Sequence, residues 1–381
     1  MTNPALIVTN DEKKAVWDAY RAHKPIRVPV VLGTNPRIVI LNPSLNPEGI
    51  SFERYFQDPW VTVDMQVRWQ RYRVEVLNQY CDDPSGLPDI WQVYVDRQNV
   101  YESAFFGAPL EFRAGQVPDV RPYLDDDHKE SIFQIDIEHP LEYGFFRDAL
   151  DYAEGMRAVA ANLLIDDRPV KVNNYMPTGC DGPLTIAANI RGQGILADLI
   201  ADQDYAHRVF DYIIQAAINR VQATRRYYQD ETIGCGLADD SIQLISTKTY
   251  REMVMPHHGR FYDTFFPGKP RSIHLCGDSQ HHFKTLRDEL NIQSFDTGFP
   301  VDFGKLRREL GPDVEILGGP PVAILLQAAP GQVYTCTRDI LCSGITEGGR
   351  FILREGNNLP PLVPEANLAA MYQACLDYGR Y

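Results

Sequence analysis

An imidazole and a thiol stand two residues apart in this chain, at His274 and Cys276, directly after the short run 271–273. The run predicts the end of a buried strand, and alternate residues of a strand project from the same face, so the two side chains should enter one space. Zinc binds imidazole and thiolate in tetrahedral geometry, and the pair therefore predicts half of a zinc site. The alternative interpretation is a hydrogen-bonded core histidine beside a buried, inert cysteine.

The elements that must position this pair alternate between strand and helix from about residue 171 onward. Short apolar runs predict strands, and the segments between them repeat apolar residues at helical spacing. This rhythm predicts a parallel sheet with helical crossovers. The predicted strands are 170–175, 232–237, 271–276, 292–296, 314–319 and 351–353, and the predicted helices are 198–228, 247–265, 281–290, 302–310 and 330–343.

The N-terminal half is less regular. A helix is predicted over 11–22, a strand over 27–33 and another strand near 105–112. Together with the later strands these close naturally into a (β/α)8 TIM barrel, and we expect a single domain over residues 1–381. The stretch 34–140 has no clean period, so we interpret it as a long excursion of the first βα units that covers the catalytic mouth.

The mouth of such a barrel is lined by residues that follow the C-terminal ends of its strands. The topology therefore predicts a polar site that mixes amides, carboxylates, an imidazole and a thiol. Asn and Asp in such loops also cap helices and turn the chain, so each has a structural alternative. The predicted members include Asn174, Tyr175, Asp240, His274, Cys276, Asp278, Asp296, Asn357 and Asn358.

Two adjacent histidine pairs, His257-His258 and His281-His282, fall on predicted helices. Neighbouring residues of a helix face in directions about 100° apart, which makes such a pair a poor set of ligands for one ion. We expect these four histidines to be solvated.

The composition argues against several classes of partner. The net charge is −14, and no cluster of Lys and Arg extends beyond Arg225-Arg226 and Arg307-Arg308, whereas nucleic-acid binding needs a basic surface. No window approaches 18 uninterrupted apolar residues and the N-terminal segment lacks a signal-peptide pattern, so we expect no membrane span and a cytoplasmic location. Seven cysteines without a CxxC pair are typical of reduced thiols.

Several segments, taken in order, carry a resemblance to a known family. The chain resembles the uroporphyrinogen decarboxylase superfamily, and within it the branch of zinc- and cobamide-dependent methyltransferases of the coenzyme M type. The most specific match is His274-Leu275-Cys276-Gly277, which is similar to the HxCG motif of that branch. The other matching segments are 182–187 with 191–192, 237–241 with 250–256, 317–319, and 356–361 with 364–368.

The resemblance implies a TIM barrel whose HxC pair and a later cysteine hold zinc, which binds a thiol for reaction with a methylated corrinoid. His274 and Cys276 fall on the first two ligands, whereas the third cysteine of the family falls on Asn357. An amide oxygen is a poor substitute for a thiolate on zinc. A carboxylate from Asp240, Asp278, Asp296 or Glu355 could complete a catalytic zinc site instead.

The leading hypothesis is a methyltransferase that moves a methyl group between a corrinoid carrier protein and a small thiol or methylated substrate, such as a methoxylated compound. Because the chain shows no fused corrinoid domain, the carrier would be a separate chain. On this hypothesis Asn189, Asn357 and Asn358 orient the substrate. The oligomeric state stays open, and a homodimer is one candidate because relatives often form dimers.

Two other functions remain open. One is a metal-free lyase, a decarboxylase of a substrate other than uroporphyrinogen, with Asp240 or Asp296 as the acid and Asn174 and Tyr175 as binding groups. The arginine-rich segment of the true decarboxylases is absent after Leu32. The other is a non-catalytic binder of a corrinoid or tetrapyrrole, which the loss of the third thiol would permit.

Overall fold

The chain forms two compact units, each assembled from separate stretches of sequence. The computed structural model describes residues 8–174 and 178–381. Unit 1 comprises the described part of Met1–Asn46, Arg68–Pro88 and Leu275–Tyr381, and unit 2 comprises Pro47–Val67 and the described part of Asp89–His274. The chain therefore passes between the units four times, the last time inside one strand, β6 (Arg271–Leu275).

A parallel sheet forms the core of unit 1. Phe295, Ile316 and Phe351 are in register across three of its strands, and all three side chains are buried. Val30 extends this sheet through a parallel bridge to Leu353. The order of the strands is β6-β7-β8-β9, with β7 at Ile292–Thr297, β8 at Glu315–Gly318 and β9 at Phe351–Leu353.

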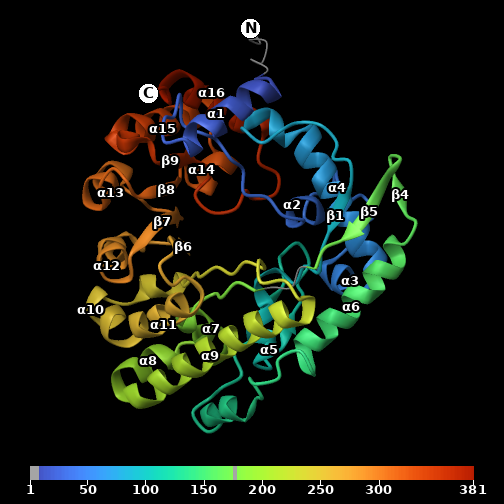
Figure 1. Ribbon diagram of the computed structural model, residues 1–381, viewed down its shortest axis with the longest axis vertical. Coiled ribbons are helices and arrows are strands. Elements are labelled where there is room, and N and C mark those ends of the chain that lie inside the picture. Colours follow the sequence, from blue (N-terminus) through green and yellow to red (C-terminus); the bar gives the residue numbers. More distant parts are fainter. Residues whose placement is uncertain (1–7, 175–177) are drawn as a thin grey trace. The chain divides into compact units, whose positions relative to one another are not determined.

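Helices alternate with these strands along the chain. Figure 1 shows α12 and α13 outside β7 and β8, where they cover one face of the sheet. The first helix begins with a capping box, in which Thr9 Oγ1 accepts from the Glu12 N–H at 3.2 Å and the Glu12 carboxylate accepts from the Thr9 N–H at 2.7 Å. The helices of unit 1 are α1 (Asn10–Arg21), α2 (Arg37–Ile40), α12 (Gln280–Leu290), α13 (Phe303–Leu310), α14 (Val322–Gln327), α15 (Pro330–Ile340) and α16 (Glu365–Tyr378).

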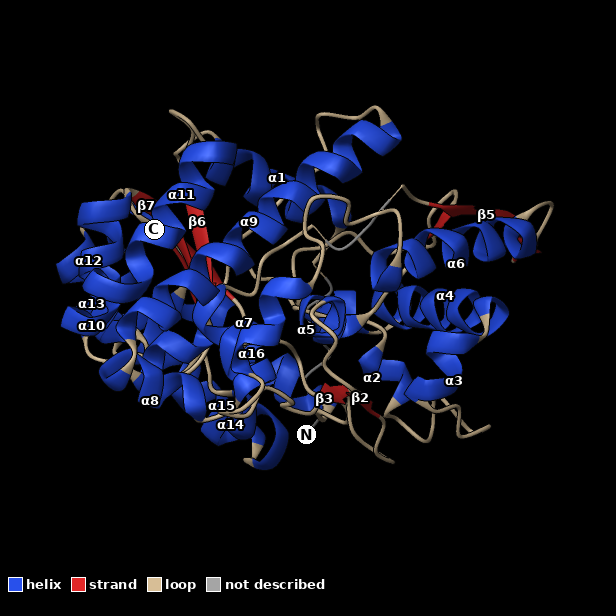
Figure 2. Ribbon diagram, turned by 90° about the horizontal axis from the view of Figure 1, so that it is seen from below, coloured by secondary structure: helices blue, strands red, loops and turns tan. Residues whose placement is uncertain are grey.

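Helices also dominate unit 2. Its parallel strand pairing continues through single bridges, from Cys180 to Leu237 and from Ala238 to His274 at the end of β6. Figure 2 shows α6 running along β5, and these two elements pack together. Its elements are α3 (Phe52–Gln57), β1 (Trp91–Val93), α5 (Tyr101–Phe105), β2 (Leu110–Glu111), β3 (Asp119–Val120), α6 (Gly144–Ala160), β4 (Leu164–Ile165), β5 (Arg168–Val172), α7 (Pro183–Arg191), α8 (Gly194–Ala201), α9 (Gln203–Tyr228) and η4 (Asp240–Leu244).

A π-helical turn, η5 (Tyr250–Val254), joins α10 (Thr247–Thr249) to α11 (Met255–Phe265). Such turns occur mostly as single-turn bulges within α-helices. The helix that follows buries both His257 and His258, and α12 buries His282, so the expectation that these three are solvated is wrong. Only their positions on helices were predicted, because sequence spacing alone does not show that α11 packs against α9.

Most predicted elements are present. The helices over 11–22, 247–265, 281–290, 302–310 and 330–343 and the strands that became β5, β6, β7, β8 and β9 are confirmed to within a few residues. The helix predicted over 198–228 is interrupted at Asp202. The side chain of Asp202 accepts from the Tyr205 N–H at 3.3 Å and so begins a new helix, α9.

Four predictions for less regular segments hold only in part. The strand over 27–33 is reduced to isolated bridges at Arg27 and Val30. The strand near 105–112 is shorter than predicted, because Phe105 ends α5 and only Leu110–Glu111 form a strand, β2, which pairs with β3. The strand over 232–237 is reduced to a bridge at Leu237. The stretch 34–140 is more regular than expected, since α4 (Pro59–Glu75) alone has 17 residues.

Within residues 8–174 and 178–381, none of the helices has the length and apolar character needed to cross a lipid bilayer.

Candidate metal centre and active site

The end of β6 fixes the backbone of the imidazole and thiol pair. The His274 N–H donates to the Leu237 carbonyl at 3.1 Å, and the Gly298 N–H donates to the Leu275 carbonyl at 2.8 Å. Cys276 directly follows the strand, and Gly277 then turns the chain with a φ of +73°, a region that glycine adopts without strain. His274 and Cys276 are both half-buried, as alternate residues of one strand end.

A buried carboxylate sets the course of the neighbouring loop. Asp239 accepts from the Leu184 N–H at 3.2 Å, the Thr185 N–H at 2.8 Å and the Thr185 hydroxyl at 2.7 Å, and it lies 3.0 Å from His258 Nε2. Asp239 and His258 are completely buried. A Cβ on Gly182 would lie 2.3 Å from the Asp239 Cβ, so the loop and the start of α7 approach as closely as only glycine allows.

The next residue, Asp240, completes a set of three ligand atoms with the HxC pair. One carboxylate oxygen of Asp240, one ring nitrogen of His274 and the Cys276 sulfur all lie within 4.8 Å of one another. A backbone bridge brings these residues together, because Ala238 pairs with His274. Asp240 follows two residues after Ala238, and Cys276 follows two residues after His274. One imidazole, one thiolate and one carboxylate are a donor set that zinc accepts, so these residues fit the metal that the family resemblance implies.

A second carboxyl group lies in the electrostatic reach of this set and was missed by the sequence reasoning. Burial, followed by the charges of Glu102 and Asp240, raises the pKa of Asp181 to about 8, although Arg220 and His274 act in the opposite direction. The Asp181 carboxyl therefore holds its proton at neutral pH. Its position after Cys180, which pairs with Leu237, was the signal that could have found it.

Glu102 anchors the loop that carries Asp181. Its Oε2 accepts from the Asp181 N–H at 2.7 Å, and its Oε1 accepts from Arg220 Nη2 at 2.7 Å. Both Glu102 and Arg220 are buried, and Arg220 also stacks over the rings of Tyr101 and Phe146. This buried ion pair fixes the backbone at Asp181.

The predicted acid Asp296 is engaged by an arginine in unit 1. Its two carboxylate oxygens lie 2.8 and 2.7 Å from Arg354 Nη1. A carboxylate that is held in this way is a poor proton donor. Arg354 was not among the predicted site residues. It places a cation directly after β9, where the sequence predicted only amides and carboxylates.

Glu355 adjoins this arginine and is completely buried. Its Oε1 accepts from the Gly33 N–H at 2.8 Å and from Arg354 Nη2 at 3.1 Å, while its Oε2 has no hydrogen-bond partner among residues 8–174 and 178–381. Burial raises the pKa of Glu355 to about 7 against the opposing effect of Arg354. A Cβ on Gly33 would lie 2.2 Å from Arg354 Nη2, so glycine is required for this packing.

The predicted amides have different partners within the two units. Asn174 is exposed and accepts from Arg157 of α6 at 3.2 Å, and Asn189 of α7 donates to the Ser103 hydroxyl at 3.3 Å. Asn357, with a φ of +104°, accepts from Arg354 Nη2 through its carbonyl at 2.7 Å, and Asn358 beside it is half-buried. Tyr175 lies outside the described residues.

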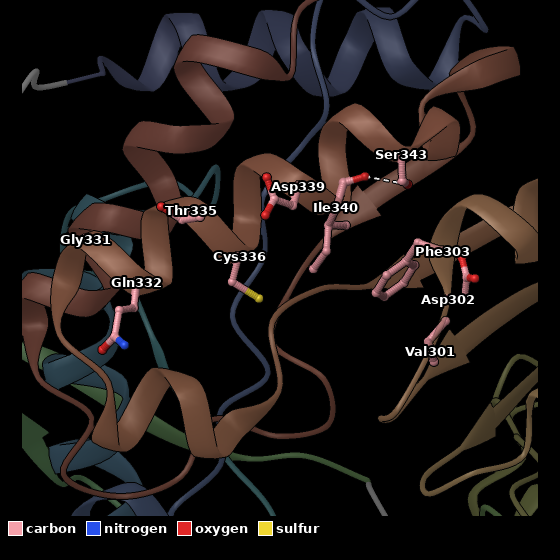
Figure 3. Close-up of a pocket in the computed structure, with 10 residues that line it drawn as sticks. All are labelled: Val301, Asp302, Phe303, Gly331, Gln332, Thr335, Cys336, Asp339, Ile340 and Ser343. Atoms are coloured by element: carbon pink, nitrogen blue, oxygen red, sulfur yellow. Dashed lines mark hydrogen bonds between the residues drawn. The ribbon is translucent and has the colours of Figure 1, made fainter.

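A separate pocket of about 580 Å³ in unit 1 involves none of the predicted site residues. In Figure 3, Cys336 and Ile340 of α15 line it opposite Phe303 of α13, and the Ser343 hydroxyl donates to the Ile340 carbonyl at 2.7 Å. Its walls are mainly apolar, and it offers no group of ligands comparable with the set around His274.

Comparisons with known proteins give both a family and a fold. The family model described as "Uroporphyrinogen decarboxylase (URO-D)" matches residues 99–378. The methylated-thiol–coenzyme M methyltransferase of Methanosarcina mazei is 30% identical over 200 residues, which make up 51% of this chain and 51% of that protein. The chain thus matches about half the length of this curated relative. A solved methyltransferase from Methanosarcina mazei superposes with a TM-score of 0.63 at 16% identity, over 97% of this chain and 99% of that one, which shows a shared fold.

Proposed function

Because this chain belongs to the uroporphyrinogen decarboxylase family, we propose that it is a methyltransferase that moves a methyl group between a corrinoid carrier protein and a small thiol or methylated substrate. The name of the Methanosarcina relative, a methyltransferase for methylated thiols and coenzyme M, supports this substrate class. The carrier would be a separate protein chain.

The observation that carries the proposal is the set of ligand atoms from Asp240, His274 and Cys276, which lie within 4.8 Å of one another. A zinc ion held by these residues would act as a Lewis acid that lowers the pKa of a bound thiol. In this assignment Asp240 takes the role that a second cysteine has in the resembling branch. A carboxylate and a thiolate carry the same charge, so the replacement leaves the charge of the ligand set unchanged while making it harder.

The surrounding residues maintain this site. Asp239 holds the loop that presents Asp240, through four contacts with three residues, Leu184, Thr185 and His258. Asp181, with its pKa raised to about 8, stays protonated at neutral pH and adds no further negative charge beside Asp240. A second negative charge at this position would repel a substrate thiolate bound beside Asp240.

Metal analysis of purified variants tests the ligand assignment. We expect close to one zinc per chain in the wild type and a loss of at least tenfold in zinc affinity in both Cys276→Ser and Asp240→Asn. Cys342→Ser, which removes an exposed thiol, and Asp278→Asn, which changes an exposed carboxylate close to Cys276, are the matched controls. Equal zinc content in all five proteins would reject this ligand set.

Methyl transfer itself can be followed with methylcobalamin as a substitute for the carrier protein. We expect the visible absorbance of methylcobalamin to change on incubation with the zinc-loaded protein and a small thiol. The rate should fall at least 100-fold in Cys276→Ser and stay unchanged in Cys342→Ser. Zinc binding without any thiol-dependent demethylation would separate the metal site from the proposed reaction.

A metal-free lyase is the second candidate, and it is favoured by the placement of Asp181, whose N–H donates to the buried Glu102 and whose pKa is raised by burial and by the charges of Glu102 and Asp240. A carboxyl group with a pKa of about 8 can supply a proton to a carbanion formed when carbon dioxide is lost. Asp181 replaces Asp296 in this role, since Asp296 is held by Arg354. Decarboxylation that survives chelators and disappears in Asp181→Asn would favour the lyase, whereas activity abolished by chelators would reject it.

A further inference from the structure

Two histidines from different helices of unit 2 meet in the lining of an open cavity. His207 of α9 and His257 of α11 lie 50 residues apart in sequence, and His207 Nδ1 is 3.2 Å from His257 Nε2. The ring centroids are 5.5 Å apart and the planes are inclined by 43°, so the rings meet edge to edge rather than stack. The two ring nitrogens therefore face each other at hydrogen-bond distance, and one of them carries the proton between them.

From this geometry we propose that His207 and His257 form a second metal site, for a late transition ion such as Zn²⁺, Co²⁺ or Ni²⁺. Two imidazole nitrogens bound to one tetrahedral zinc, each at about 2.0–2.1 Å, stand about 3.3–3.4 Å apart. The separation in this protein is 3.2 Å, close to that value. An ion bound to both nitrogens would lie off the line that joins them, so each ring must turn when the ion replaces the shared proton.

Burial prepares His257 for this role. Its ring packs edge-on against Phe210 at a centroid distance of 5.8 Å, and the side chain is almost fully buried. Burial, followed by the neighbouring His207, lowers the pKa of His257 to about 4. Neutral imidazole is the form that binds metal ions, and the packing holds its orientation.

A carboxylate lies nearby but must move to become a third ligand, because its oxygens do not come within 4.8 Å of both ring nitrogens. Asp211 lies one helical turn beyond His207, on the same face of α9, and lines the same cavity of about 500 Å³. Its Oδ1 accepts from Arg260 Nη1 at 2.5 Å. The arginine thus competes with an ion for Asp211, and water molecules in the open cavity can supply the remaining ligands.

The site would act as a cross-link between two helices. It joins α9 to α11, which pack together, and α11 carries His258 at the buried hydrogen bond to Asp239. An ion that binds only the folded form stabilises it by mass action. The site differs chemically from the set around Cys276, because it contains no sulfur ligand.

Cobalt binding to metal-free protein tests the site apart from the one at Cys276. In a Cys276→Ser background we expect one Co²⁺ per chain by equilibrium dialysis, with no thiolate charge-transfer absorbance. Adding His207→Ala should lower the affinity of that ion at least tenfold and remove the rise in melting temperature that cobalt produces. Equal cobalt affinity with and without His207 would overturn the proposal.

A second variant should bind cobalt more tightly than its parent, and misfolding cannot explain such a gain. Arg260→Gln removes the cation that competes for Asp211, so cobalt affinity should rise at least threefold in the same background. A folded Arg260→Gln protein with unchanged affinity would overturn the assignment of Asp211 as a ligand. Neither test depends on methyl transfer, so the second site can fail while the proposed function stands.

Discussion

Individual side chains around Arg354 show how burial changes the chemistry of a carboxyl group. Arg354 is shared between Asp296, which has both oxygens close to the guanidinium, and Glu355, which has one oxygen without a partner. The pKa of Glu355 rises to about 7 even though a cation lies next to it. Desolvation therefore outweighs the attraction of Arg354 at this position.

Glu355→Gln should flatten the dependence of stability on pH. The folded pKa of about 7 exceeds the ordinary value of 4.5, so the folded state binds more protons than the unfolded state between these values, and stability falls as the pH rises through this window. Between pH 5 and pH 8 the free energy of unfolding, measured with urea, should fall by roughly 2–4 kcal/mol less in the variant than in the wild type, because Asp181 titrates in both proteins. An identical pH dependence in both proteins would contradict a raised pKa at Glu355.

Asp239→Ala should destabilise the protein by about 3–5 kcal/mol, because it leaves His258 and two backbone N–H groups buried without an acceptor. Chemical denaturation measures the change. Asp263→Ala is the control, since Asp263 forms a largely exposed ion pair with Arg271 that is worth about 0–1 kcal/mol. Similar losses in both variants would argue against a special role for Asp239.

At this scale the sequence predicts ligands better than their surroundings. The spacing of His274 and Cys276 and the position of Asp240 after a strand end suffice to nominate three side chains that lie together. Asp181 and Arg354 could not be nominated in this way, because their properties depend on burial and on partners such as Glu102 and Asp296 that are remote in sequence. The exposure of Asn174 could not be predicted for the same reason, because exposure also depends on segments that are remote in sequence.

At the scale of elements, one segment shows why periodicity misleads. Val61, Val63, Met65, Val67 and Trp69 alternate with polar residues as in a half-buried strand, yet they lie in the helix α4 and all are buried. Thr62 and Gln66 between them are buried too, because they hydrogen-bond to the Tyr55 and Tyr94 carbonyls. A helix that is buried on several faces has no apolar stripe for a sequence pattern to reveal.

Gly298→Ala should weaken zinc binding although Gly298 provides no ligand. A Cβ at this position would lie 2.6 Å from the Cys276 Cα and 2.8 Å from the Gly277 N, so the turn after β6 must move. We expect a loss of about 1–3 kcal/mol in stability and a clear loss of zinc by elemental analysis. Gly234→Ala, whose Cβ would meet no atom within 4 Å, should retain its zinc. A fully loaded Gly298→Ala protein would show that this turn does not position Cys276.

At the scale of the whole molecule, the TIM barrel predicted from alternating strands and helices is the fold of the family to which the chain belongs, and the solved methyltransferase shares it. The later strands could be predicted because parallel buried strands are continuous apolar runs. The covering role of 34–140 stays a prediction. The sequence pattern of 34–140 does not show what this segment packs against, because its packing partners are distant along the chain.

We expect the protein to unfold in a single cooperative transition. Unit 1 is assembled from three stretches of sequence and the chain passes between the units four times, so neither unit is a continuous segment that could fold before the other is synthesised. Calorimetry should give one endotherm with matching calorimetric and van't Hoff enthalpies. Two resolved transitions would contradict the prediction of a single domain.

The π turn at Tyr250–Val254 gives the chain an unusual vulnerability to length change. Each helical residue turns the following ones by about 100°, so deleting one residue to restore a regular α-helix would rotate the whole of α11. His257 would leave His207 and His258 would leave Asp239 in the same step. A lineage that keeps both contacts must therefore keep this extra residue, and with it the Tyr250 hydroxyl that lies 3.1 Å from His258 Nδ1.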